Sequence, residues 1–204
     1  MMGELKHTGC GLFGIRIVRA RRWMKDGKLI LRLRRLRDLL ALQSMLTPVI
    51  LRETSGIEPG AFGSVFSFWF WLRTTFQAVF VMEVEERGRR RIVGFAGLYG
   101  MKMGRSLWLS LAVFDPKDRR QGYGKQTIGL LLESFKTQGV ARSILVEVSR
   151  KNIPSLHFFR NLGFKIFERY KDRLFLEKGE GEEALSSLSL EDGIEPFSKR
   201  RLDQ

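Results

Sequence analysis

The chain has 204 residues, 44% of them hydrophobic, which is enough for one domain with a substantial core. Its formal net charge is +14, with 36 basic and 22 acidic residues. This charge favours anionic partners such as a nucleotide-like cofactor, an acidic protein or a nucleic acid surface, although a basic surface that serves only solubility explains it as well. One cysteine excludes an internal disulfide, and with only two histidines there is no zinc-binding pattern, so no metal is expected.

Cysteine usage and hydropathy also bear on location. A lone cysteine, Cys10, and the lack of a charged-then-apolar pattern at the N-terminus predict a reducing, cytoplasmic compartment. Residues 65–84 are apolar and aromatic, but Arg73 and Gln77 interrupt them, so we expect a buried helix followed by a buried strand rather than a membrane span. A protein held at a membrane through residues 66–72 is the alternative.

The N-terminal part of the chain predicts a β-hairpin. In residues 14–23 and 29–36, apolar residues are interspersed with basic ones. The stretch 24–28 between them contains Asp26-Gly27, a pair that commonly closes a hairpin. We therefore expect two paired strands here.

The middle of the chain predicts two helices and then three strands. The first helix is Leu-rich and stops before Pro48, since proline cannot continue a helix. A charged turn separates the first two strands. The expected helices cover 37–46 and 64–74, and the expected strands cover 76–85, 91–103 and 107–114.

Strands and helices alternate in the C-terminal half. A helix follows the strand at 107–114, with apolar residues at i, i+3, i+4 and i+7 and with Gly139 as its stop. A strand at 142–148, a helix from Asn152 to Gly163 and strands at 164–170 and 173–177 complete the series. The order predicts an α/β (α+β) fold: a mixed central sheet of about six or seven strands with helices on both faces.

Composition divides the chain into three parts. Residues 1–28 are expected to form an N-terminal extension that contributes one hairpin strand, and residues 29–178 the main domain. Residues 179–204 are rich in Gly, Ser, Glu and Asp and are expected to be a polar tail.

The sequence between the strand at 107–114 and its helix predicts an anion site. It contains Arg119-x-x-Gly122-x-Gly124 and runs straight into the helix. The first N–H groups of a helix lack internal partners and its dipole favours negative charge, so this turn should hold a phosphate or pyrophosphate. A tight strand-to-helix turn without a ligand is the alternative. The P-loop and Rossmann patterns are excluded, because the Gly-Lys-Ser/Thr end and the third glycine are missing.

A second motif follows about 30 residues later, with Leu-Val-Glu-Val-Ser-Arg-Lys-Asn at 145–152 and Ser-Leu-His-Phe-Phe-Arg-Asn-Leu-Gly-Phe at 155–164. In this order and spacing, the glycine loop and this block resemble the GNAT superfamily of acetyl-CoA-dependent N-acetyltransferases. The resemblance covers residues 30–177 and is strongest over 107–164. It implies the GNAT fold, and acetyl-CoA as the acyl donor, without a metal.

The resemblance also implies a cofactor site. In the family, main-chain groups of a splayed strand pair with the pantetheine arm, the glycine loop binds the pyrophosphate, and an asparagine binds the cofactor arm. Capping of a helix is a second, compatible role for Asn152. The residues implied in cofactor binding are Ala112, Val113, Phe114, Arg119, Arg120, Gln121, Gly122, Tyr123, Gly124, Lys125, Asn152, Ser155 and Phe159.

Catalytic residues follow from the same resemblance. The run 145–152 resembles the branch that acetylates protein N-termini, including ribosomal-protein alanine acetyltransferases, where a glutamate five residues before the asparagine is the general base. Glu147 fits this position, and a charge in an apolar strand is costly to bury without a role, although a solvated strand residue is the alternative. The family usually has tyrosine at Phe159 to protonate the departing thiolate. Phenylalanine cannot do so, and Tyr170 and Tyr123 are candidate substitutes.

The predicted function is acetyl transfer from acetyl-CoA to a primary amine, on a protein or peptide N-terminus or a small molecule, by direct attack in a ternary complex. A ribosome-associated protein suits the basic surface as acceptor, nucleic acid is not expected as a substrate, and a homodimer is left open. The alternative function is a binding or regulatory module that keeps the acyl-CoA site but catalyses weakly.

Overall fold

Among the described residues, the central sheet has eight strands in the order β1-β2-β3-β4-β5-β6-β8-β7, and β5–β6 is the one parallel pair. The structure is a computed structural model that describes residues 23–47, 50, 64–100 and 106–179. The strands are β1 Trp23–Asp26, β2 Leu29–Leu33, β3 Ala78–Glu86, β4 Arg89–Tyr99, β5 Ser106–Val113, β6 Ser143–Ser149, β7 Lys165–Tyr170 and β8 Arg173–Gly179. The helices are α2 Asp38–Met45, α4 Val65–Thr75, α5 Tyr123–Gln138 and α6 Ile153–Asn161, with a 3-10 turn, η1, at Pro116–Asp118.

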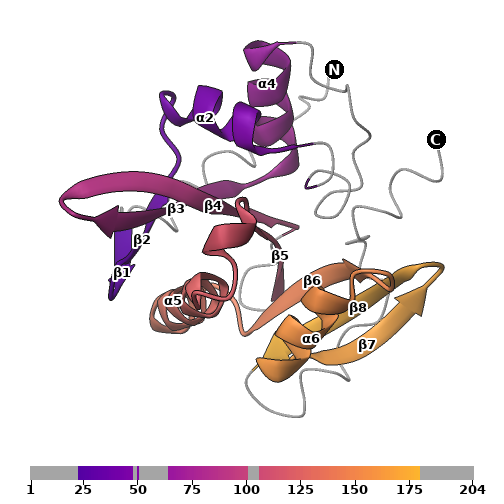
Figure 1. Cartoon of the computed structure of the whole chain (residues 1–204). Helices are drawn as coiled ribbons and strands as arrows, with labels where there is room; N and C mark the ends of the chain where they lie inside the picture. The colour runs from indigo at the N-terminus through magenta and orange to yellow at the C-terminus, as the bar shows by residue number, and fades with distance from the viewer. Residues whose placement is uncertain (1–22, 48–49, 51–63, 101–105, 180–204) are drawn as a thin grey trace, which may run out of the picture.

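Helices cover the sheet on two sides (Figure 1). Side chains of α5 and α6, such as Ile128 and Phe159, share one core cluster with the strands. Side chains of α2 and α4, such as Leu42 and Phe68, form a second cluster on the other face. The predicted mixed sheet with helices on both faces is confirmed, although it has eight strands rather than six or seven.

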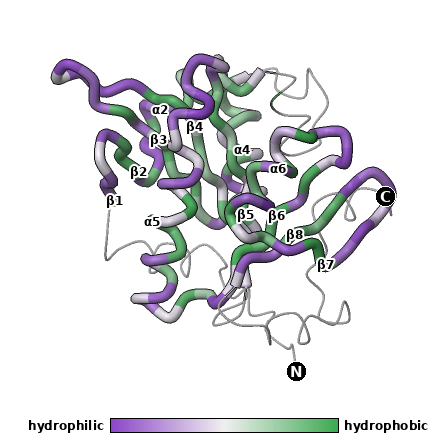
Figure 2. The backbone as a smooth tube through the Cα atoms, turned by 60° about the horizontal axis from the view of Figure 1, so that its bottom comes forward, coloured by the Kyte–Doolittle hydropathy of each residue, from purple (hydrophilic) through white to green (hydrophobic). Residues whose placement is uncertain are grey.

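Strand β5 shows how the sequence divides the two cores. Successive side chains of a strand point to opposite faces. Leu107 and Leu109 therefore join the cluster under α5 and α6, whereas Trp108 and Ala112 join clusters on the other face. Hydrophobic residues consequently run along the central strands, with hydrophilic residues in the outer turns (Figure 2).

The predicted N-terminal hairpin is present, with a shorter connection than expected. Its first described strand is β1, which takes in residues 24–26 of the expected connection, and the turn is Gly27-Lys28. Gly27 has a φ of 56°, a conformation that favours glycine. Since β2 pairs with β3, the hairpin forms one edge of the main sheet. Residues 14–22 and 180–204 lie outside the described residues.

Helix α4 begins at a capping box, in which the side chain of Ser64 accepts a hydrogen bond from the Ser67 N–H and Ser67 bonds back to the Ser64 N–H. The helix buries Phe68 and Leu72 and leads into β3. Within the described part of the chain, no helix is long and apolar enough to cross a membrane.

Candidate active site

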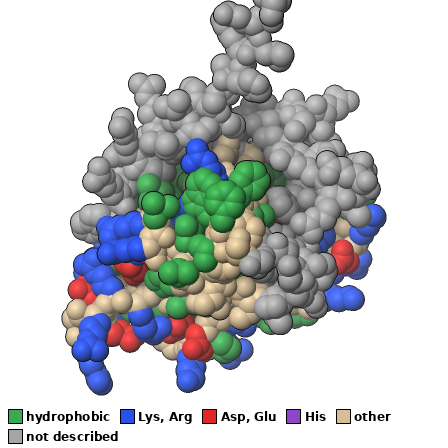
Figure 3. All heavy atoms as spheres, turned by 90° about the horizontal axis from the view of Figure 1, so that it is seen from above, with side chains coloured by type: hydrophobic (Ala, Val, Ile, Leu, Met, Phe, Trp, Pro, Cys, Tyr) green, Lys and Arg blue, Asp and Glu red, His purple; other side chains and the backbone are tan. Residues whose placement is uncertain are grey.

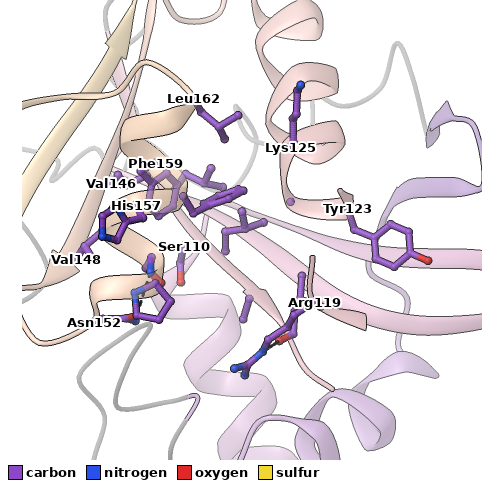
Figure 4. Close-up of a pocket in the computed structure, with 18 of the residues that line it drawn as sticks. Ser110, Arg119, Tyr123, Lys125, Val146, Val148, Asn152, His157, Phe159 and Leu162 are labelled. Atoms are coloured by element: carbon purple, nitrogen blue, oxygen red, sulfur yellow. Dashed lines mark hydrogen bonds between the residues drawn. The ribbon is translucent and has the colours of Figure 1, made fainter. Parts of the chain in front are cut away.

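The parallel strands β5 and β6 separate after three residue pairs. Ser106, Leu107 and Trp108 pair with Ser143, Ile144 and Leu145, and no pairing between the two strands follows. A cleft of about 1160 Å³ opens where they part, lined by the ends of both strands, the start of α5 and most of α6. Figure 4 shows Asn152, His157 and Phe159 on one side of this cleft and Arg119, Tyr123 and Lys125 on the other.

The main chain of β5 faces the cleft at alternate residues. The Phe114 N–H donates to the Val93 carbonyl on β4, at 2.9 Å. Because hydrogen bonding alternates along an antiparallel strand, the polar groups of Val113 and Leu111 point away from β4, toward the cleft. The Val113 carbonyl accepts a hydrogen bond from the Arg119 Nε at 3.3 Å.

The cleft lining includes two of the three strand residues expected to bind the pantetheine arm. Ala112 and Val113 line the cleft, whereas Phe114 is not among its lining residues. The ring of Phe114 stacks on Phe95 at 6.0 Å, in the core under α2 and α4. Leu111 lines the cleft and was not expected, since only the hydrogen-bond register with β4 shows which residues of β5 face outward.

The loop before α5 contains two residues with left-handed backbone. Arg120 has a φ of 62° and Gly122, the N-cap residue, a φ of 84°. The left-handed region costs a non-glycine residue about 1–2 kcal/mol, so the surroundings of Arg120 must hold it there. The first hydrogen bond of the helix runs from the Gln126 N–H to the Gly122 carbonyl, at 3.0 Å. The preceding N–H groups are therefore the orphan donors that suit an anion.

The two glycines of the loop are required for different reasons. A Cβ on Gly122 would meet nothing within 4 Å, so glycine is favoured here by the positive φ and not by lack of space. A Cβ on Gly124 would lie 2.9 Å from the Phe158 ring and 3.6 Å from Leu111. Gly124 thus permits α6 to pack closely against the start of α5, a constraint that the loop sequence does not reveal.

The cleft has an excess of positive charge. Its basic lining residues are Arg119, Arg120, Lys125 and Lys151. Its two acids both pair with arginines outside the lining: Asp118 with Arg91, at 2.6 Å, and Glu147 with Arg173, at 3.5 Å. The net field favours a polyanionic ligand such as a diphosphate.

Glu147 enters the cleft from the face of the sheet opposite α5 and α6. Its neighbours Val146 and Val148 pack in the core under those helices, so Glu147 shares a face with Leu145. Its carboxylate is largely buried, and the Arg173 guanidinium offsets its charge. A carboxylate therefore lies on the lining, on the side opposite the helices that carry the loop and Asn152.

Phe159 lies on the cleft wall within an aromatic cluster. Its ring meets Phe158 at 5.0 Å and Phe164 at 5.1 Å, and it carries no group that donates a proton. Tyr170, the first candidate acid, is not among the lining residues and packs with the cluster around Trp108 and Phe175.

The other two tyrosines both line the cleft. Tyr123 was a candidate from the sequence. Tyr99 was not: it stacks on Trp108 at 6.1 Å, and only the pairing of β4 with β5 brings it to the site.

Asn152 caps α6. Its Oδ1 accepts a hydrogen bond from the Ser155 N–H, at 3.2 Å. This is the N-cap role considered for it, and both residues also line the cleft.

Among the loop residues expected to bind the cofactor, Gln121 does not line the cleft. Ser110, Lys151 and His157 do line it and were not among the expected site residues; Lys151 and His157 lie inside the two quoted motifs, whereas Ser110 lies in neither. No group of His, Cys, Asp and Glu among the described residues is arranged to hold a metal ion.

The site is thus a cleft between two parted parallel strands, beside the start of a helix with unpaired N–H groups. The chain belongs to the acetyltransferase (GNAT) family, whose sequence model matches residues 45–164. The N-acetyltransferase 9-like protein of Schizosaccharomyces pombe is 34% identical over 76 residues, which are 34% of this chain and 35% of that protein. The match thus spans about a third of the relative's length.

Solved structures show the same fold. Spermidine N-acetyltransferase from Vibrio cholerae, in complex with CoA and spermine, has a TM-score of 0.61 at 18% identity, over 76% of this chain and 97% of that one. The Salmonella typhimurium acetyltransferase that modifies the N-terminal serine of ribosomal protein L7/L12 has a TM-score of 0.62 at 11% identity, also over 76% and 97%. At these identities the likeness establishes the fold alone.

Proposed function

We propose that the protein transfers an acetyl group from acetyl-CoA to a primary amine, by direct attack within a ternary complex. The observation that carries this proposal is the parting of β5 and β6 beside the start of α5. Strand edges left unpaired there offer main-chain groups to the pantetheine arm. The thioester would then lie in the gap between the strands, open to an amine.

The loop and the start of α5 would hold the diphosphate. N–H groups from Gly122 to Lys125 are the donors, and Arg119 and Arg120 add positive charge. Each charge-assisted hydrogen bond contributes roughly 1.5–3 kcal/mol, so three or four are enough to anchor the cofactor. Asn152 is proposed to bind the pantetheine arm.

Glu147 is proposed to be the general base, directly or through a water. The amine nitrogen attacks the thioester carbonyl, the carbon–sulfur bond breaks, and the amine proton passes to the carboxylate. At pH 7, deprotonation costs about 1.4 kcal/mol for an α-amine and about 4.6 kcal/mol for lysine, so a single carboxylate favours an α-amine. The departing thiolate has a pKa of about 8.5 and leaves tolerably without an acid. Tyr99 and Tyr123 line the cleft and are our candidates for protonating it.

A protein or peptide N-terminus is our preferred acceptor, with a small-molecule amine as the second choice. The two solved relatives act on a ribosomal protein N-terminus and on a polyamine, so the fold accommodates both kinds of acceptor. The net charge of +14 supports an acidic or ribosome-associated acceptor. The lone cysteine supports the cytoplasm as its location.

Thiol release from acetyl-CoA, measured against a panel of peptides, polyamines and other amines with mass spectrometry of the products, tests the function. We expect acetylated α-amines, and a kcat/KM that falls by about 10²–10⁴ in Glu147→Gln. Full kcat/KM across pH in that variant would remove Glu147 as the base. Gly122→Val should raise the calorimetric Kd for acetyl-CoA, and an unchanged Kd would contradict the loop assignment.

One observation favours a second function, an acyl-CoA-binding module with little catalysis. Phe159 leaves the usual position of the acid without a proton donor. Such a module would bind acetyl-CoA in the calorimeter yet release no thiol with any acceptor of the panel, which separates it from an enzyme.

A further inference from the structure

Four large hydrophobic side chains are exposed around α2 and α4. They are Leu36 (74% exposed), Leu40 (68%), Phe66 (70%) and Phe70 (57%), and we call them the α2–α4 face. Seen from above, hydrophobic side chains gather over these helices with Lys and Arg side chains beside them (Figure 3). An apolar patch that a protein leaves open to solvent commonly marks a docking surface.

The arrangement follows from the sequence of α4. Phe68 and Leu72, at i and i+4, are fully buried against the sheet. Phe66 and Phe70 have the same spacing but occupy the opposite side of the helix, where a surface helix normally carries polar residues. Burial in the core thus explains Phe68 and Leu72 but not the exposed Phe66 and Phe70.

Among the described residues of α2, α4 and the turn before α2, the exposed charged side chains are basic. Arg35, Arg37 and Arg73 are exposed. Asp38 is the single acid in residues 34–46 and 64–77, and it is buried.

The partner of that acid explains why it does not offset the arginines. Asp38 accepts two hydrogen bonds from the Arg32 guanidinium, at 2.7 and 2.9 Å. Burial and the nearby charge of Arg73 together lower the pKa of Arg34, as expected where guanidinium groups crowd together. The α2–α4 face thus presents aliphatic and aromatic side chains among unneutralised arginines.

We propose that the α2–α4 face docks on the surface of an anionic membrane. Aromatic and Leu side chains that enter the headgroup region, flanked by basic residues that attract anionic lipids, are the features of a helix that lies in the interface. With 11 residues, α4 is about 16 Å long and lies on the bilayer without crossing it. Only Phe66, Phe70 and their neighbours on α2 insert, since Phe68 and Leu72 belong to the core.

Charge also argues against a second copy of the chain as the occupant. A symmetric dimer through this face would bring Arg35, Arg37 and Arg73 of both copies into one interface, with no exposed acid on these helices to pair with them. Anionic lipid headgroups supply the missing negative charge. The proposal is independent of the acetyltransferase activity.

Co-sedimentation of the full chain with vesicles tests the proposal. We expect binding to vesicles that contain phosphatidylglycerol, little binding to phosphatidylcholine alone, and weaker binding as salt is added. Phe66→Ser/Phe70→Ser should lower the partition coefficient about tenfold or more. The triple variant Arg35→Ser/Arg37→Ser/Arg73→Ser should lower it roughly a hundredfold, at about 1 kcal/mol for each charge.

Matched variants remove the same groups elsewhere. Ile153→Ser deletes the other exposed large hydrophobic residue of the described chain. The triple variant Arg87→Ser/Arg89→Ser/Arg90→Ser deletes three exposed charges at the β3–β4 turn. If the face is the docking surface, Ile153→Ser keeps full binding and the turn variant keeps most of it. Circular dichroism and Tm confirm that each variant is folded.

Four results would overturn the proposal. The first is equal binding to neutral and anionic vesicles. The second is equal loss in the face variants and their matched controls. The third is a dimer by light scattering that Phe66→Ser/Phe70→Ser converts to a monomer. The fourth is polyglutamate binding that needs this phenylalanine pair while vesicles do not bind. The third and fourth results would assign the face to a protein.

Discussion

The guanidinium of Arg91 on β4 donates two hydrogen bonds to the carboxylate of Asp118, at 2.6 and 2.7 Å. Asp118 is buried at the end of η1, and the next residue, Arg119, begins the loop that leads into α5. The hydrogen bonds from Arg91 to Asp118, and secondarily to Glu86, raise the pKa of Arg91 above its ordinary value. A bidentate ion pair therefore ties the proposed pyrophosphate loop to the sheet.

Removal of Arg91 should loosen that loop. Arg91→Ala leaves the buried Asp118 carboxylate without its main partner, at a cost of about 1–3 kcal/mol. We expect the calorimetric Kd for acetyl-CoA to rise roughly tenfold, whereas kcat at saturating acetyl-CoA stays near that of the wild type. Arg91→Lys keeps the charge but not the bidentate geometry, so its Kd for acetyl-CoA should lie between those of the wild type and Arg91→Ala.

A neighbouring arginine provides the control. Arg90→Ala removes an exposed charge that pairs with Glu85 at 4.0 Å, so it should leave the Kd unchanged. An Arg91→Ala variant that binds acetyl-CoA as tightly as Arg90→Ala would show that the ion pair does not position the loop.

The parts of the fold that the sequence predicted are those encoded locally. The helix at α5 carries its own apolar spacing and its glycine stop, and the loop–helix–strand order needs no distant contact. The same holds for the capped helix at Asn152. The expected hairpin connection, residues 24–28, was too long, because residues 24–26 are as consistent with a strand as with a connection, and only the pairing of β1 with β2 shows that they form a strand.

The parts of the site that the sequence missed depend on contacts between distant segments. Tyr99 reaches the cleft through its pairing with Trp108, and Leu111 through its register with β4. Phe114 has the right position in the motif but points into the opposite core. Gly124 meets a ring that lies 34 residues further along the chain, at Phe158.

The two loop glycines should respond differently to alanine. Gly122→Ala adds a Cβ in open space but forces alanine into the left-handed region, at about 1 kcal/mol. Gly124→Ala drives a Cβ into the Phe158 ring and should cost about 1–3 kcal/mol of unfolding free energy. Urea unfolding measures both.

A double variant separates a steric effect from a backbone effect. Phe158→Leu shortens the ring that the new Cβ would meet, so it should recover part of the stability that Gly124→Ala loses and none that Gly122→Ala loses. Equal recovery in both backgrounds would contradict the assignment of Gly124 to helix packing.

The buried network that attaches α2 to the sheet predicts an acid-sensitive contribution. Arg32 donates two hydrogen bonds to Asp38 and one, at 2.5 Å, to Glu83. Desolvation alone would raise the pKa of Asp38, but the hydrogen bonds from Arg32 and the Arg35 N–H outweigh it, and the pKa lies below its ordinary value. A lowered folded-state pKa stabilises the protein above the unfolded value of about 3.9, and this contribution is lost as the pH falls through the folded pKa.

Substitution of Arg32 should lower the unfolding free energy strongly, because Asp38 and Glu83 both depend on it. Arg32→Met leaves two buried carboxylates without their cation, and we expect a loss of about 3–5 kcal/mol at pH 7 that shrinks in acid, where the carboxylates are protonated. The triple variant Arg32→Met/Asp38→Leu/Glu83→Leu, which removes every charge, should be close to the wild type. Urea unfolding at pH 7 and pH 4 tests both, and a loss in Arg32→Met that does not change with pH would exclude the electrostatic origin.

Glu177 on β8 should make the protein less stable as the pH rises, which is the opposite of the Asp38 contribution. It lies opposite Leu145 on β6, is 4% exposed, and neither carboxylate oxygen has a hydrogen-bond partner within the described structure. Burial raises its pKa. The Ser143 hydroxyl acts in the opposite direction but by less, so the pKa lies above its ordinary value. The folded state therefore holds the proton more tightly than the unfolded state. Stability falls as the pH rises from the unfolded pKa of about 4.3 to the folded pKa, and the full cost is present above it.

Replacement by an isosteric neutral side chain should remove that cost. We expect Glu177→Gln to raise the unfolding free energy by about 1–2 kcal/mol at pH 8 and to have little effect at pH 4, where both variants are neutral. Thermal unfolding at the two pH values should show a gain in Tm of roughly 2–8 °C at pH 8 only. Glu133→Gln on the exposed side of α5 is the control and should change neither value. A gain that is equal at both pH values would show that packing rather than charge is responsible, and a loss at pH 8 would show that the carboxylate is stabilised where it lies.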